Sequence, residues 1–137
     1  MDKLKPQERS ENMRRIRSKG MKPELEVRRL VHSLGYRYRL HVKTLPGKPD
    51  LVFPSRRKVI QVHGCFWHQH KDPACKIVRQ PKSNTSYWSE KLKRNEERDS
   101  RQAEWFSREG WSVLTVWECG IEDKRVLSRA ITRFLNA

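Results

Sequence analysis

Side chains that can transfer protons or bind metals are concentrated in one eight-residue stretch of the sequence. It reads His63-Gly64-Cys65-Phe66-Trp67-His68-Gln69-His70, with imidazoles, a thiol and two large aromatic rings close together. Imidazoles titrate near neutral pH, and imidazoles and thiolates both bind metal ions. Random composition rarely produces such a stretch, so it predicts a catalytic or metal-binding site. For any single histidine the alternative is a surface or capping imidazole.

A carboxylate stands where a turn leads into an apolar run. Asp50 follows Leu45-Pro46-Gly47-Lys48-Pro49 and precedes residues 51–53. Metal-dependent cleavage of a phosphodiester needs a carboxylate at the entry to a strand and further ligands on the neighbouring strand. Magnesium takes hard oxygen ligands and keeps several waters, so one carboxylate, a backbone carbonyl and a DNA phosphate suffice. The alternative is that Asp50 is only a turn residue after Pro49.

The composition indicates a polyanionic partner. The chain has 137 residues, enough for one domain, and 31 Lys and Arg against 16 Asp and Glu give it a net charge of +15. Such a surface serves DNA, RNA or an anionic membrane equally well. No apolar run is long enough to span a membrane and no signal peptide precedes the charged N-terminus, so we expect a cytoplasmic protein. Three cysteines without an export signal disfavour a disulfide framework and leave thiolate chemistry, metal binding or burial.

The elements that must position these residues can be predicted from periodicity. Apolar residues recur at helical spacing in four segments, and they alternate with polar residues or form short apolar runs in four others. The predicted helices cover residues 10–18, 23–34, 85–108 and 126–135, and the predicted strands cover 36–43, 50–53, 58–63 and 111–117. The order ααβββαβα predicts an α/β fold, a mixed four-stranded sheet flanked by helices as in restriction-type nucleases.

Five ordered motifs give the chain a resemblance to the very short patch repair (Vsr) DNA mismatch endonucleases over residues 10–135. They are Asn12-Met13-Arg14, Leu45-Pro46-Gly47-Lys48-Pro49-Asp50, His63-Gly64-Cys65-Phe66-Trp67-His68, Glu97-Arg98-Asp99 and Val116-Trp117-Glu118-Cys119. The resemblance implies a single nuclease domain, residues 1–137, in which residues 1–19 form a basic segment that contacts DNA. It also implies a magnesium-dependent nickase that cuts duplex DNA 5′ of the mispaired T in a T:G mismatch and so initiates very short patch repair.

The resemblance also implies roles for the polar residues. The family is similar to the PD-(D/E)xK nucleases but lacks the second acidic residue and the lysine. Asp50 would be the central magnesium ligand, assisted by the carbonyl of Val62, where the family has threonine. His68 would be the general base. By the same resemblance Glu24 would orient His68, His63 would sit beside the scissile phosphate, and Asp99 would support His63 from the long helix. Solvated surface carboxylates are the alternative for Glu24 and Asp99.

The same comparison gives the cysteines and the exposed aromatic residues a function. The set Cys65, His70, Cys75 and Cys119 matches the usual ligands of a structural zinc. The interval between His70 and Cys75 is longer than is typical of the family, so His68 or Asp72 could take the place of His70, and free buried thiols are a further alternative. Five residues would act as apolar wedges in DNA, namely Phe66, Trp67 and Trp88 from one groove and Met13 and Ile16 from the other. Periodicity favours core packing for Trp105, Trp111 and Trp117.

Two other kinds of protein share some of these features. An HNH-like nuclease also combines histidine and metal, but its ββα hairpin does not fit the predicted strand order. A non-catalytic, zinc-stabilised DNA-binding module would use the basic surface and leave Asp50 as a turn residue. RNA recognition is disfavoured, because no aromatic pair on a strand face is present to stack unpaired bases. We therefore expect a monomer that acts on chromosomal DNA at T:G mismatches, with other mismatch-repair proteins as candidate partners and no membrane association.

Overall fold

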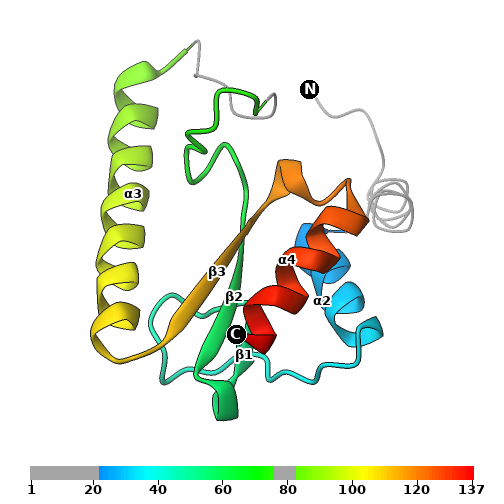
Figure 1. The fold of residues 1–137 in the computed structure, drawn as a ribbon. Helices are drawn as coiled ribbons and strands as arrows, with labels where there is room; N and C mark the ends of the chain where they lie inside the picture. Colours follow the sequence, from blue (N-terminus) through cyan, green and yellow to red (C-terminus); the bar gives the residue numbers. More distant parts are fainter. Residues whose placement is uncertain (1–21, 76–82) are drawn as a thin grey trace, which may run out of the picture.

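A three-stranded mixed sheet with helices on both faces forms the protein in the computed structural model, which describes residues 22–75 and 83–137 (Figure 1). The strands are β1 (Leu51–Phe53), β2 (Lys58–His63) and β3 (Ser112–Trp117), in the order β1-β2-β3. β1 is antiparallel to β2, and β2 is parallel to β3. The mixed α/β class is therefore confirmed. The predicted first helix, with Met13 and Ile16, and the basic segment 1–19 lie outside the described residues.

Helix α3 (Thr85–Arg108) makes the crossover between the two parallel strands and stands on one face of the sheet, while α2 (Pro23–Ser33) and α4 (Lys124–Asn136) lie on the other (Figure 1). The alternation of side chains along a strand decides which core each residue joins. Leu51, Phe53 and Ile60 pack with α2 and α4. Val52 and Val59 pack with Phe106 of α3. Three of the four predicted helices and three of the four predicted strands thus lie close to their predicted bounds.

The predicted strand at residues 36–43 is wrong as a sheet strand. Its burial does alternate as predicted, with the Tyr36, Tyr38, Leu40 and Val42 side chains half-buried and the intervening residues exposed. Its backbone, however, pairs with β1 only through one bridge between Arg39 and Val52. His41 adopts a left-handed φ of 56°, which an extended strand does not allow. The segment therefore leaves the edge of the sheet, and a four-stranded sheet does not form in the described part of the chain.

The end of α3 sets where β3 begins. Gly110 has a φ of 77°, and its N–H donates to the carbonyl of Ser107 at 3.3 Å. The N–H of Trp111 donates to the carbonyl of Phe106 at 2.8 Å. These two bonds form the Schellman pattern, which favours glycine at the left-handed position after a helix. The chain reverses within two residues and returns to lie beside β2.

The expected core packing holds for two of the three tryptophans concerned. Trp105 and Trp111 are half-buried against the core between α3 and the sheet. Trp117 lies at the end of β3 and stacks its ring on His70, with ring centroids 4.1 Å apart. Its prediction as a core residue is therefore wrong, because it covers a histidine of the cysteine-rich loop instead. No helix among the described residues is long and apolar enough to cross a membrane.

Candidate active site and metal centre

Asp50 lies at the entry to β1, and its carboxylate reaches across to the neighbouring strand. The N–H of Val62 in β2 donates to Asp50 Oδ2 at 2.7 Å. Burial raises the pKa of Asp50 above its ordinary value, and the nearby Glu24 carboxylate raises it further, whereas the Val62 N–H and Arg28 act in the opposite direction. A buried carboxylate beside a second carboxylate is the setting that a bound cation stabilises, because the cation offsets both effects.

A cavity of about 420 Å³ joins Asp50 to the histidines. Its walls come from the turn before β1, the end of β2, the loop after β2 and one side of α3. It is lined by Gly47, Lys48, Pro49, Asp50, Gln61, Val62, His63, His68, Arg98, Asp99 and Gln102. Four of the residues predicted to act on DNA, Asp50, His63, His68 and Asp99, therefore face one space.

His63 and His68 stack face to face in this cavity. Their ring centroids are 3.8 Å apart and the ring planes differ by 7°. Burial lowers the pKa of His63 to about 4, and repulsion from His68 contributes in the same direction, although Asp99 opposes the shift. At neutral pH the His63 ring is therefore uncharged. The ligand atoms of His63, His68 and Asp99 lie within 4.8 Å of one another.

The two carboxylates predicted to serve the histidines lie on different sides of Asp50. Asp99 of α3, predicted to support His63, contacts His68, with His68 Nδ1 2.5 Å from Asp99 Oδ2, and it is also near enough to His63 to act on the pKa of that ring. For Glu24 of α2 the family resemblance predicts a role in orienting His68. Glu24 instead lines a different pocket together with Asp50 and raises the pKa of that carboxyl group. Sequence order could not assign these pairs, because it does not say on which side of Asp50 each helix packs.

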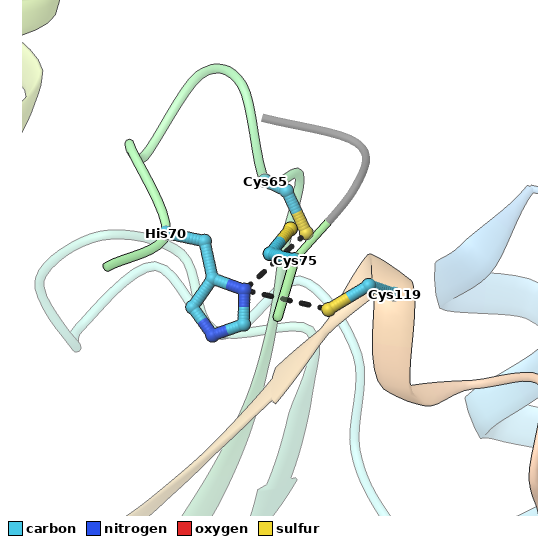
Figure 2. Close-up of side chains that lie close together, drawn as sticks. All are labelled: Cys65, His70, Cys75 and Cys119. Atoms are coloured by element: carbon cyan, nitrogen blue, oxygen red, sulfur yellow. Dashed lines mark hydrogen bonds between the residues drawn. The ribbon is translucent and has the colours of Figure 1, made fainter. Parts of the chain in front are cut away.

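Cys65, His70, Cys75 and Cys119 converge on one point, as predicted (Figure 2). The His70 Nδ1 atom lies 3.4 Å from Cys119 Sγ and 3.7 Å from Cys65 Sγ, and the four ligand atoms are all within 4.8 Å of one another. His68 is held by Asp99, and Asp72 accepts a hydrogen bond from the N–H of Ala74 at 2.9 Å. His70 is thus the fourth member of the cluster, and neither of its two alternatives is.

The chemistry of this cluster fits a metal ion such as zinc. Burial raises the pKa of Cys65 to about 12, with hydrogen bonds among the three thiols adding to the effect, and burial also raises the pKa of Cys119. Without a cation these thiols stay protonated at neutral pH, whereas a bound zinc ion favours their thiolate forms. Three of the residues come from the loop after β2 and the fourth follows β3, so a metal here would join the loop to the sheet.

A group of partly exposed aromatic rings lies beside the active-site cavity. Phe66, Trp67 and Trp88 contact one another with ring centroids 5.3 to 5.7 Å apart, although Trp88 lies on α3 and the other two on the loop after β2. Trp67 is 45% exposed. Lys91 Nζ lies 5.2 Å from the centre of the Trp67 ring. The three predicted wedge residues that the structure describes therefore form one surface with a positive charge above it.

The structure adds two residues that the sequence analysis did not select. Lys91 lies over the Trp67 and Trp88 rings, and its place three residues after Trp88 on one helix was a usable signal. Arg28 lies four residues after Glu24 on α2 and lines the same pocket as Glu24 and Asp50. Residues four apart share a helix face, so any role given to Glu24 pointed to Arg28 as well.

Comparisons with known proteins show the family to which the chain belongs. Residues 1–74 match the family model for the DNA mismatch endonuclease Vsr. The chain is 48% identical to the type II nicking enzyme V.XorIIP of Xanthomonas oryzae pv. oryzae over 135 residues, which is 98% of this chain and 97% of that protein. It is 38% identical to the DNA mismatch endonuclease Vsr of Escherichia coli over 129 residues, covering 93% of this chain and 81% of the relative.

A third relative, the type II nicking enzyme V.NmeAIP of Neisseria meningitidis, is 38% identical over 128 residues, covering 93% of this chain and 89% of the relative. These three similarities each cover 93% or more of this chain. The protein is a member of the Vsr family of DNA mismatch endonucleases, and it is a DNA-nicking enzyme.

Proposed function

We propose that this enzyme nicks one strand of duplex DNA 5′ of the mispaired T in a T:G mismatch and thereby initiates very short patch repair. The observation that carries the proposal is the convergence of Asp50, His63 and His68 on one cavity of about 420 Å³. Two relatives are named type II nicking enzymes, a name that states nicking without a mismatch, whereas the Escherichia coli relative is named a mismatch endonuclease. Recognition of the mismatch is therefore the part of the function to test first.

Asp50 and the backbone carbonyl of Val62 would hold a magnesium ion. Both offer the hard oxygen atoms that magnesium prefers, and the raised pKa of Asp50 fits a carboxylate that a cation stabilises. When bound, magnesium polarises a phosphoryl oxygen and offsets the charge that develops during cleavage. A backbone ligand at Val62 tolerates the change from the family's threonine, because the carbonyl is the same for either side chain.

His68 accepts the proton of the attacking water in this proposal. Asp99 as a carboxylate accepts a hydrogen bond from His68 Nδ1, and this fixes the tautomer in which Nε2 is free to take a proton. His63 stacks on His68 and remains neutral, so it limits the positions that the His68 ring can adopt and adds no charge beside it. The water oxygen bonds to the phosphorus, the P–O bond on the opposite side breaks, and the departing oxygen takes up a proton from solvent, so one strand is nicked.

Mismatch recognition is assigned to the cluster of Phe66, Trp67 and Trp88. A mismatched step costs less to unstack than a paired step, so an aromatic wedge opens it preferentially. The loop after β2 carries Phe66 and Trp67 and is also the loop held by the Cys65 and His70 part of the metal cluster. A structural zinc in that cluster would therefore hold the aromatic wedge and His68 in fixed positions relative to the sheet.

The test is nicking of matched and T:G-mismatched duplexes that are identical in all other bases and carry varied flanking sequences. We expect single-strand cleavage of the T:G duplex in magnesium, none with chelator, and at least about tenfold slower cleavage of the matched duplex, since opening a paired step costs more. Equal cleavage of both duplexes would refute mismatch specificity while leaving the nicking activity in place. Metal-independent cleavage would refute the assignment of Asp50.

A further inference from the structure

The guanidinium group of Arg28 lacks one hydrogen bond within the described part of the chain. Its Nε atom is buried and has no partner there. A buried N–H without an acceptor costs free energy, and in native structures most such groups are satisfied. Arg28 also lines a pocket of about 280 Å³ next to Asp50. Arg28 thus combines an unsatisfied donor with a place on the wall of a pocket, and a ligand in that pocket could supply acceptor atoms to the guanidinium group.

The lining of this pocket, here called the Arg28 pocket, favours an anion. It consists of Glu24, Arg28, His41, Lys43, Lys48, Pro49 and Asp50. Three side chains are cationic at neutral pH and two are carboxylates, one of which is the proposed magnesium ligand. Arg28 is near enough to lower the pKa of Asp50, but its Nε does not bond to that carboxylate. Arginine matches the geometry of phosphate oxygens through its fork of donors, so phosphate is the anion that fits best.

The position of the pocket indicates which phosphate it would hold. Residues Lys48, Pro49 and Asp50 line both the Arg28 pocket and the active-site cavity, so they form the wall between the two. His68 lines the cavity and Arg28 lines the pocket. In an in-line displacement the attacking and leaving oxygens stand on opposite sides of the phosphorus. If His68 activates the water on one side of the phosphorus, the leaving oxygen lies on the other side, toward Asp50 and Arg28.

We infer that the Arg28 pocket binds a DNA backbone phosphate adjacent to the scissile one, on its leaving-group side, through Arg28, Lys43 and Lys48. The inference rests on the proposed placement of cleavage at Asp50. Its consequence is that these residues hold the strand in register for cleavage, without taking part in the proton transfers. The ligand is a phosphodiester of DNA, and free inorganic phosphate is the competing source of the same chemistry.

The first experiment measures DNA binding without magnesium, so it does not depend on cleavage. Arg28→Gln is compared with Arg29→Gln, which removes the same charge from the next, exposed position of α2 and does not line the pocket. Fluorescence anisotropy on matched and T:G duplexes gives the dependence of affinity on salt. We expect Arg28→Gln to reduce the magnitude of the slope of log affinity against log salt concentration by about 0.9, the effect of one phosphate contact. The variant should also bind about tenfold more weakly. Arg29→Gln should keep the parental slope.

The second experiment identifies the phosphate. Single methylphosphonates, which are uncharged, replace successive phosphates around the nick in the T:G duplex. One position on the leaving-group side should weaken parental and Arg29→Gln binding, and the same replacement should cost Arg28→Gln nothing further. Arg28→Lys keeps the charge without the fork, so it should retain the salt slope and recover only part of the affinity. Melting temperatures of all variants show whether they are folded.

Two results would overturn the inference. One is an Arg28→Gln variant that has the parental melting temperature and shows the same salt dependence of binding to the matched duplex as Arg29→Gln. Because it uses the matched duplex, this comparison holds even if the enzyme does not prefer T:G mismatches. The other is stabilisation of the parent, but not of Arg28→Gln, by inorganic phosphate while both bind DNA equally. That second outcome would assign the pocket to a free anion.

Discussion

His68 Nδ1 lies 2.5 Å from Asp99 Oδ2, which joins the loop after β2 to the middle of α3. An ionised carboxylate only accepts hydrogen bonds, so this contact places the ring proton on Nδ1 and leaves Nε2 as the acceptor. The His63 ring, stacked at 3.8 Å, restrains His68 from a second direction. The orientation of the proposed base is therefore set by two contacts that come from different elements.

Loss of this pair should reduce nicking by amounts typical of a general base. We expect His68→Ala to slow single-turnover nicking by about 10²- to 10⁴-fold while DNA binding stays near the parental value. Asp99→Asn should cost less, because an amide can still contact the ring but no longer fixes one tautomer. The double variant should be little worse than His68→Ala, since the two residues act as a unit. Glu104→Gln, an exposed change on the same helix, is the control, and additive losses would contradict the coupling.

Asp50→Ala should abolish nicking and leave most DNA binding intact. The change removes the carboxylate that we propose as the magnesium ligand, which accepts a hydrogen bond from the N–H of Val62, and with it the electrostatic stabilisation that the metal would give the transition state. Because Asp50 carries a negative charge near the expected path of DNA, binding without magnesium should be equal to the parent or tighter. Single-turnover nicking and anisotropy measure the two effects, with Glu122→Ala, an exposed site, as the control. Near-parental nicking by Asp50→Ala would mean that the catalytic centre lies elsewhere.

The purified protein should contain about one zinc ion per chain. Cys119→Ser keeps the size of the side chain but replaces a soft thiolate ligand, so elemental analysis should show loss of zinc. The melting temperature should fall by about 10 °C or more, because the cluster joins the loop after β2 to the end of β3. Ser128→Ala, on α4, provides the comparison. Folded, active protein without zinc would refute a structural metal at this site.

Trp67→Ala should lower the preference for a T:G mismatch over a matched duplex. Trp67 is 45% exposed and contacts Phe66 and Trp88, so its removal takes away a stacking surface at little cost to the core. Stacking of a base on an aromatic ring contributes roughly 1 to 3 kcal/mol, so we expect the ratio of affinities to fall by about tenfold or more. Val126→Ala removes an exposed apolar side chain on α4 and should leave the ratio unchanged. An unchanged ratio in Trp67→Ala would exclude this ring as the wedge.

Gly47→Ala should destabilise the turn that carries Asp50. Gly47 has a φ of 75°, and an added Cβ would stand 2.5 Å from Gln102 Oε1. The left-handed backbone alone costs roughly 1 to 2 kcal/mol for a residue with a Cβ. Added to Gly47→Ala, the change Gln102→Ala should restore the stability lost through the contact with Gln102 but not the stability lost through the left-handed backbone. Thermal unfolding measures both, and Gly120→Ala, where nothing lies within 4 Å of an added Cβ, should cost less. Full recovery by Gln102→Ala would show that the backbone is not strained.

Local sequence patterns predicted those helices and strands whose type and ends are marked by residues within or next to the element itself. The long helix 85–108 has a glycine placed to end it, and residues 58–63 form a short apolar run, so both were found at the bounds that the structure has. The prediction of a sheet strand at residues 36–43 was wrong for a specific reason. Its alternating side chains predicted which residues are half-buried, but alternation does not say whether a strand finds a partner, and the left-handed His41 ends the pairing after one bridge.

The chemistry of the site was determined by residue types, and its pairings by the fold. The residue types of the stretch 63–70, with Cys75 and Cys119, together with the family resemblance, predicted a four-residue metal cluster, and the structure selected His70 over His68 and Asp72 as its fourth member. The partners of the carboxylates were not predictable, because a hydrogen bond such as that of His68 with Asp99 depends on how α3 packs on the sheet. Likewise, α2 placed Glu24 and Arg28 beside Asp50. Residue type limits what a side chain can do, whereas packing between distant segments decides which group it meets.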